Sequence, residues 1–167
     1  MRAHRAGALL KDKIKSLSVL QKIAARLKKQ GKVVVFTNGC FDVLHFGHAK
    51  YLEEAKKKGD ILIVALNSDS SVKKIKGKKR PIVSEAYRLG LIAALESVDY
   101  VVLFKEETPL RVIRALKPDV LIKGADWHAG SIVGADFVKG LGGKVATVSL
   151  VKGLSTTGII KKIAQAH

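Results

Sequence analysis

Two histidines stand three residues apart around a glycine in the run His45-Phe46-Gly47-His48. The residues from Gly47 to Lys58 have helical periodicity, which places His48 in the first turn of a helix. Residues three apart share one face of a helix, and the first turn leaves backbone N–H groups unpaired for an anion. Paired imidazoles, a glycine and the positive end of a helix together predict a site for a phosphate chain.

Strand-like and helix-like segments alternate along the whole chain. The predicted strands are 33–37, 61–67, 100–104, 120–122 and 144–149, and the predicted helices are 16–29, 47–58, 68–74, 84–95, 109–116, 135–140 and 156–164. Continuous apolar strands separated by helices favour a Rossmann-like, doubly wound α/β fold, with a five-stranded parallel sheet and helices on both faces. Ligands of such folds bind beyond the carboxyl ends of the strands. The turns after 33–37, 61–67 and 120–122 should therefore border one cleft.

We expect a single folded domain over residues 16–167, preceded by a basic mobile arm over residues 1–15. The one cysteine, Cys40, excludes an internal disulfide, and the N-terminus lacks the pattern of a secretory signal, so a cytoplasmic location is expected. Cys40 follows the polar turn, where it could be a nucleophile. A small buried apolar residue is the favoured interpretation for a cysteine between Gly39 and Phe41.

The net charge of +17 is concentrated in residues 1–32 and 73–80. Such stretches are either solvated faces or nucleic-acid footprints. Neither stretch holds a tyrosine or tryptophan on which bases could stack, so a nucleic-acid partner is not favoured. No apolar run approaches the length that crosses a membrane.

Further motifs accompany the histidine pair. They are Thr37-Asn38-Gly39-Cys40-Phe41-Asp42 before it, then Asn67-Ser68-Asp69, Lys76-Gly77, Arg80-Pro81-Ile82, Tyr87-Arg88, the run from Val120 to Asp126, and the run from Leu154 to Ile160. With these motifs, which span most of its length, the chain resembles the HxGH nucleotidyltransferase superfamily. Within it, the chain is most similar to the enzymes that adenylylate D-glycero-β-D-manno-heptose 1-phosphate, in their stand-alone form.

This resemblance implies adenylyl transfer from ATP to the heptose 1-phosphate, which gives ADP-heptose and pyrophosphate for lipopolysaccharide-core assembly. It also implies a Mg²⁺ cofactor and a homodimer. The alternative is a CTP-dependent cytidylyltransferase for glycerol 3-phosphate or a related polyol phosphate. Leu150 stands where that branch usually has an arginine, which favours the heptose branch, whereas Asp126-Trp127 resembles the cytidylyltransferases.

The resemblance also assigns site residues. His45, His48 and Arg88 are predicted to be catalytic, and Arg88 stands out because its helix is otherwise apolar, so its charge needs a partner. Nucleotide or phosphate contacts are predicted for Thr37, Asn38, Gly39, Phe41, Asp42, Gly47, Lys76, Arg80, Gly124, Asp126, Ser155, Thr156 and Thr157. Asp42 either helps to hold Mg²⁺ or orients the turn through its own hydrogen bonds. Ser155, Thr156 and Thr157 form an N-cap cluster for the last helix, and the same groups could donate to phosphate.

Overall fold

The computed structural model describes residues 10–125 and 131–166. In this part of the chain five parallel strands form one sheet in the order β3-β2-β1-β4-β5. They are β1 (Val34–Gly39), β2 (Ile61–Asn67), β3 (Tyr100–Phe104), β4 (Val120–Gly124) and β5 (Lys144–Val148). The order reverses beside β1, as a doubly wound sheet requires. The predicted Rossmann-like α/β fold is confirmed.

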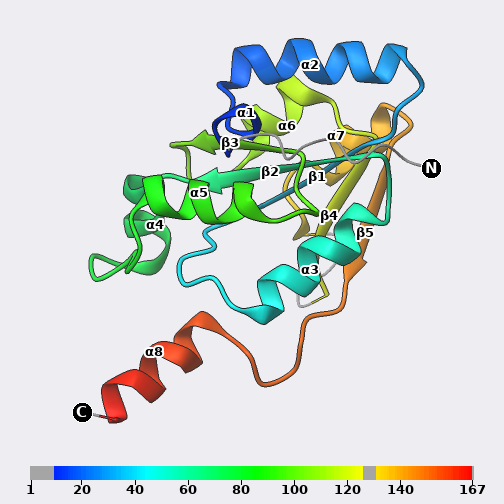
Figure 1. Cartoon of the computed structure of the whole chain (residues 1–167). Helices are drawn as coiled ribbons and strands as arrows, with labels where there is room; N and C mark the ends of the chain where they lie inside the picture. The colour runs from blue at the N-terminus through cyan, green and yellow to red at the C-terminus, as the bar shows by residue number, and fades with distance from the viewer. Residues whose placement is uncertain (1–9, 126–130, 167) are drawn as a thin grey trace, which may run out of the picture.

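Helices cover both faces of the sheet (Figure 1). They are α1 (Leu10–Lys13), α2 (Leu17–Lys29), α3 (Phe46–Lys56), α4 (Asp69–Lys76), α5 (Glu85–Ala94), α6 (Leu110–Leu116), α7 (Ala135–Gly140) and α8 (Thr156–Gln165). Side chains of a strand alternate between faces, so each strand contributes to two apolar clusters. Val34 and Phe36 pack with α2, α6 and α7, whereas Val35 packs with α3 and α5.

Serine side chains begin three of the helices. The hydroxyls of Ser16, Ser68 and Ser155 accept hydrogen bonds from the backbone N–H groups of Val19, Ser71 and Gly158, which starts α2, α4 and α8. Such caps satisfy N–H groups that the first turn of a helix leaves unpaired. The starts of α2, α4 and α8 are therefore fixed by residues close to them in the sequence.

The N-terminal segment differs from the expectation of an arm over residues 1–15. Residues 10–13 form the short helix α1, and Ile14 pairs with Val101 at the outer edge of β3. The backbone N–H of Lys15 donates to the carbonyl of Val101 over 3.0 Å, and Lys13 donates to the carbonyl of Leu95. Residues 10–15 are thus attached to the edge strand of the sheet. Within the described ranges, no helix has the length and apolar character needed to cross a bilayer.

Helix α8 projects from the rest of the molecule, at the end of the loop that follows β5 (Figure 1). None of its residues is fully buried. Its first turn nevertheless returns to the loop after β1, because the Thr156 hydroxyl donates to the carbonyl of Val43 over 3.4 Å. This contact brings the Ser-Thr-Thr cluster to the edge of the sheet where the histidine pair lies.

Candidate active site

The two histidines lie beyond the carboxyl end of β1, at the start of α3. His45 is the extended N-cap residue of α3, and His48 is in its first turn. Their imidazole rings stack with centroids 3.8 Å apart and planes 20° apart. Both Nδ1 atoms are buried and have no hydrogen-bond partner among the described residues. Buried polar atoms are rarely left unpaired, so the pair is a site prepared for a ligand.

Phe41 holds the second ring in place. Its backbone has a positive φ of 45°, in the left-handed region that non-glycine residues seldom adopt. This bend turns the Phe41 ring into an edge-on contact with His48, with centroids 5.2 Å apart. Strain of this kind persists where the surroundings require it and is common at functional sites. Phe41 was predicted to contact the nucleotide. We assign it the role of packing against His48.

Burial disfavours the charged form of both imidazoles when nothing is bound. It lowers the pKa of His45, and for His48 burial together with the neighbouring His45 lowers the pKa to about 4. A bound anion reverses this preference, because an opposite charge nearby favours the protonated ring. The arrangement can thus develop positive charge where an anion arrives.

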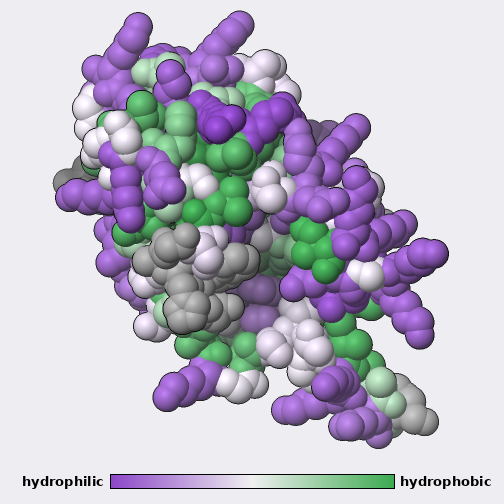
Figure 2. Space-filling model, turned by 180° about the vertical axis from the view of Figure 1, so that it is seen from behind, coloured by the Kyte–Doolittle hydropathy of each residue, from purple (hydrophilic) through white to green (hydrophobic). Residues whose placement is uncertain are grey.

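A cleft of about 750 Å³ opens beyond the carboxyl ends of the strands. It brings together most of the predicted site residues, namely Asn38, Gly39, Phe41, Asp42, His45, Gly47, His48, Lys76, Arg80, Gly124, Ser155, Thr156 and Thr157. Figure 2 shows the molecule hollowed near the centre of one face, with hydrophilic residues visible inside the hollow. The buried Oδ1 of Asn38 is another polar atom without a partner in the described residues.

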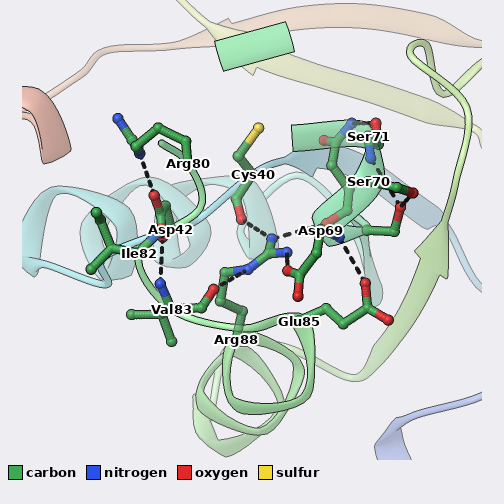
Figure 3. A network of polar contacts seen from close by, with 12 residues as sticks. Cys40, Asp42, Asp69, Ser70, Ser71, Arg80, Ile82, Val83, Glu85 and Arg88 are labelled. Atoms are coloured by element: carbon green, nitrogen blue, oxygen red, sulfur yellow. Dashed lines mark hydrogen bonds and ion pairs between the residues drawn. The ribbon is translucent and has the colours of Figure 1, made fainter. Parts of the chain in front are cut away.

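Arg88 does not line this cleft. Its side chain is fully buried beneath the turn, with 0% of the residue exposed. Nε donates to the carbonyl of Val83, one terminal nitrogen to the carbonyls of Cys40 and Asn67, and the other terminal nitrogen forms an ion pair with Asp69 at 2.7 Å (Figure 3). Arg88, predicted to be catalytic, therefore has a positioning role in this geometry, in which it joins the ends of β1 and β2 to α5.

Asp42 has a comparable structural role. One carboxylate oxygen accepts from the backbone N–H groups of Ile82 and Val83 over 2.8 and 2.9 Å, and the other pairs with Arg80 at 2.5 Å (Figure 3). Burial alone would raise the pKa of Asp42, but these hydrogen bonds outweigh burial and hold the pKa below its usual value.

Asp42 therefore does not fit a metal ion. Both of its oxygens are occupied, and Mg²⁺ would have to displace the arginine that neutralises it. The described ranges contain no cluster of three or more histidine, cysteine or acidic side chains able to hold a metal. The geometry favours the second interpretation of Asp42, a residue that orients the turn.

Thr37 is also among the residues predicted to contact the nucleotide or phosphate. Thr37 is fully buried within the sheet, where its hydroxyl pairs with that of Tyr51 at 2.7 Å and donates to the carbonyl of Ile122, so it does not reach the cleft. Asp126 lies outside the described residues.

Burial raises the pKa of the Cys40 thiol despite nearby Lys76. Because the thiolate is the reactive form, this supports the interpretation of Cys40 as a packing residue over that of a nucleophile.

Sequence reasoning missed one side of the cleft. Glu107, Thr108 and Pro109, in the loop after β3, line the cavity with Lys123 and Leu154. The signal was available for the loop, since it follows a parallel strand and such loops meet at one edge of the sheet. A Glu-Thr-Pro sequence after a strand has no chemistry of its own that would have singled it out.

Comparisons with known proteins agree with this geometry. The family model described as cytidylyltransferase-like matches residues 36–162. The chain is 54% identical over 155 residues to the Bifunctional protein HldE of Geobacter metallireducens, and 51% identical over 152 residues to that of Aliarcobacter butzleri. The alignments cover 93% and 91% of this chain but only 32% and 31% of the relatives, so the chain spans about a third of their length.

Two solved structures are similar. The lipopolysaccharide core biosynthesis protein from Thermoplasma volcanium is 36% identical, with a TM-score of 0.59 over 73% of this chain and 98% of that one. The pantoate-beta-alanine ligase of Francisella tularensis, solved with beta-gamma ATP and beta-alanine, has a TM-score of 0.61 over 92% of this chain and 76% of its own at 16% identity. The second similarity concerns the fold alone.

Proposed function

This chain belongs to the cytidylyltransferase-like family of nucleotidyltransferases, and on that footing we propose that it transfers AMP from ATP to D-glycero-β-D-manno-heptose 1-phosphate. The products are ADP-heptose and pyrophosphate. Identity of about half to the HldE proteins and the similarity to a protein of lipopolysaccharide core biosynthesis support this substrate. The stacked, unpartnered pair of His45 and His48 is the observation that carries the chemistry.

An oxygen of the sugar phosphate attacks the α-phosphorus of the nucleotide in line, and pyrophosphate leaves. The acceptor oxygen is already anionic, so the reaction depends on positioning and on charge stabilisation more than on a base. His45 and His48 hydrogen-bond the α-phosphate, and their protonation offsets the charge that grows there. Lys76 and Arg80, which line the same cleft, bind the phosphate oxygens.

The last helix supplies hydroxyl and backbone donors. Ser155 is occupied as the N-cap, since its Oγ accepts from Gly158 N over 3.0 Å. Thr156 and Thr157 line the cleft in the first turn of α8, where N–H groups and the helix dipole favour an anion. We assign this turn to the triphosphate, and Gly124, at the end of β4, to the nucleoside.

Mg²⁺ remains a prediction. It neutralises phosphate charge when bound, and it prefers phosphate oxygens and water with one or two carboxylates. Because the Asp42 carboxylate is hydrogen-bonded within the turn, we propose that Mg²⁺ enters the site already bound to the triphosphate.

The cytoplasmic location and the homodimer also remain predictions. Light scattering on the purified chain tests whether it forms a homodimer.

Pyrophosphate release tests the proposal. The chain is assayed with heptose 1-phosphate, mannose 1-phosphate and glycerol 3-phosphate, each with ATP and with CTP. We expect the pair of ATP and heptose 1-phosphate to have the highest kcat/KM. A preference for CTP of more than about tenfold, equivalent to about 1.4 kcal/mol, would instead make this chain a cytidylyltransferase.

A further inference from the structure

Glu107 places an exposed carboxylate in the lining of a cleft that must bind phosphates. Two carboxylates of the described residues line the cavity, Asp42 and Glu107. Asp42 is neutralised by Arg80. The Glu107 side chain takes part in no hydrogen bond or ion pair with another described residue. A carboxylate in this position repels both substrates at their phosphates, so a favourable contact elsewhere must compensate for it.

The neighbouring glutamate shows how the loop is arranged. Glu106 pairs with Arg111, and its carboxylate also accepts from the backbone N–H of Lys105 over 3.1 Å. Its carbonyl accepts from the hydroxyl of Ser71 over 2.7 Å, which ties the loop to α4. Glu106 does not line the cleft, whereas Glu107 does. The loop is thus anchored by one glutamate and presents the next one to the cavity.

The strand order, together with the nucleoside site proposed beside Gly124, indicates which substrate lies near Glu107. The histidine pair follows β1, the central strand, while Gly124 ends β4 on one side and the Glu107 loop follows β3 on the other. A nucleoside beside Gly124 leaves the β2–β3 side of the cleft to the acceptor. This step rests on the proposed function, which places a nucleotide and a sugar phosphate in this cavity together.

A free carboxylate binds hydroxyl groups well. It offers two acceptor oxygens and no donor, and hydrogen bonds to an ionised acceptor are about twice as strong as neutral ones. A sugar presents several neutral hydroxyls away from its phosphate. We propose that Glu107, with the adjacent hydroxyl of Thr108, binds the hydroxyl groups of the acceptor and thereby selects a polyhydroxylated sugar phosphate.

Glu107→Gln and the matched variant Glu106→Gln test this assignment. With ATP saturating, Glu107→Gln should raise the KM for heptose 1-phosphate about tenfold to a hundredfold, the size of a lost hydrogen bond to a charged group. The KM for ATP should change by less than about twofold. Glu106→Gln should leave both constants within about twofold of wild type, since its carboxylate is paired with Arg111 and does not line the cleft. Glu107→Ala should match Glu107→Gln or exceed it, and melting curves show whether each variant is folded.

Calorimetric titration of heptose 1-phosphate into the complex with a non-hydrolysable ATP analogue separates this proposal from the proposed function. If wild type binds the sugar phosphate and Glu107→Gln binds it equally well or better, the assignment of Glu107 is wrong while the function stands. An equal loss for ATP would indicate a general charge effect and also overturns the assignment. A preference of wild type for phosphoethanolamine over sugar phosphates would make Glu107 a receptor for an ammonium group. If wild type neither binds nor turns over any sugar phosphate, both proposals fail.

Discussion

Gly47 and the ring of His45 lie so close together that a methyl group on residue 47 would stand 2.9 Å from Cε1 and 3.0 Å from Nδ1 of His45. Carbon atoms do not approach side chains so closely without displacement. The same methyl group would also stand 3.4 Å from Leu154, so space around it is limited on more than one side chain's account. The glycine of the motif is therefore required by the position of the first imidazole.

Gly47→Ala should displace the His45 ring and reduce kcat by about tenfold to a hundredfold, because misplacement of a reacting group by about 1 Å has effects of this size. The melting temperature should change little. Gly90→Ala is the matched control, since an added Cβ there meets nothing within 4 Å. It should keep full activity and gain about 0.5–1 kcal/mol of stability. Wild-type turnover in Gly47→Ala would contradict the packing argument.

His48 should make the free protein less stable in mild acid. Its pKa is about 4 in the folded protein, below the ordinary histidine value of 6.5, so between these pH values the unfolded chain binds more protons. Stability therefore rises with pH across this window and is lost as the pH falls from about 6.5 toward about 4. Urea unfolding at several pH values measures this slope. His48→Asn, which cannot titrate, should flatten it, and an unchanged slope would show that other groups cause it.

Nucleotide binding should draw protons into the cleft. The phosphate raises the low pKa of His48 by favouring its charged form, so the complex binds more protons than the free protein and affinity decreases as the pH rises through the new pKa. Calorimetry of ATP binding at pH 6 in two buffers of different ionisation enthalpy counts these protons. Wild type should take up more protons than His48→Asn. Equal uptake would mean that the proton goes to the nucleotide alone.

Arg88→Lys should destabilise the fold and disorder the turn together. A lysine cannot reproduce the planar fork that reaches Val83, Cys40 and Asn67 while pairing with Asp69. Buried acceptors would lose their donors, at a cost of about 3 kcal/mol. Arg111→Lys is the control, because the exposed pair with Glu106 should contribute less than about 1 kcal/mol. Urea unfolding and kcat measure both effects, and a stable but inactive Arg88→Lys would restore a direct role in phosphate binding.

Asp42→Asn tests the assignment of the magnesium ion. The amide replaces an acceptor that receives two backbone N–H groups and Arg80, so stability should fall by about 2 kcal/mol. The Mg²⁺ concentration for half-maximal rate should stay unchanged. Asp136→Asn, in an exposed first turn of α7, should affect neither quantity. A shift in the Mg²⁺ requirement of Asp42→Asn alone would return Asp42 to the metal.

The sequence predicted the fold well where burial and capping act locally. The strands Ile61–Asn67 and Tyr100–Phe104 have the bounds that their apolar runs predicted, and Ser16, Ser68 and Ser155 cap helices at the expected places. These features depend on residues close together in the chain. Features that depend on neighbouring residues can therefore be predicted from a single sequence.

The site was predicted less completely because its details depend on distant partners. The periodicity around Arg88 showed that its charge needed compensation, but it could not show that the carbonyls of Cys40 and Asn67 would provide it. Thr37 was predicted to contact the nucleotide or phosphate, yet its hydroxyl is hydrogen-bonded to that of Tyr51 from α3. Glu107 and Glu106 are neighbours of the same type in the sequence, and only the structure shows that Glu106 pairs with Arg111 while Glu107 lines the cleft.

The stacked rings of His45 and His48 have one more consequence, for how the cleft attracts its ligand. Since both imidazoles are neutral in the empty protein, they exert no long-range pull on passing anions. Attraction at a distance falls to Lys76, an exposed and permanently charged residue of the cleft lining, because the charge of Arg80 is offset by Asp42. Protonation of the two histidines is favoured only when a phosphate is in contact with them. Their positive charge therefore stabilises a bound nucleotide but does not attract anions from a distance.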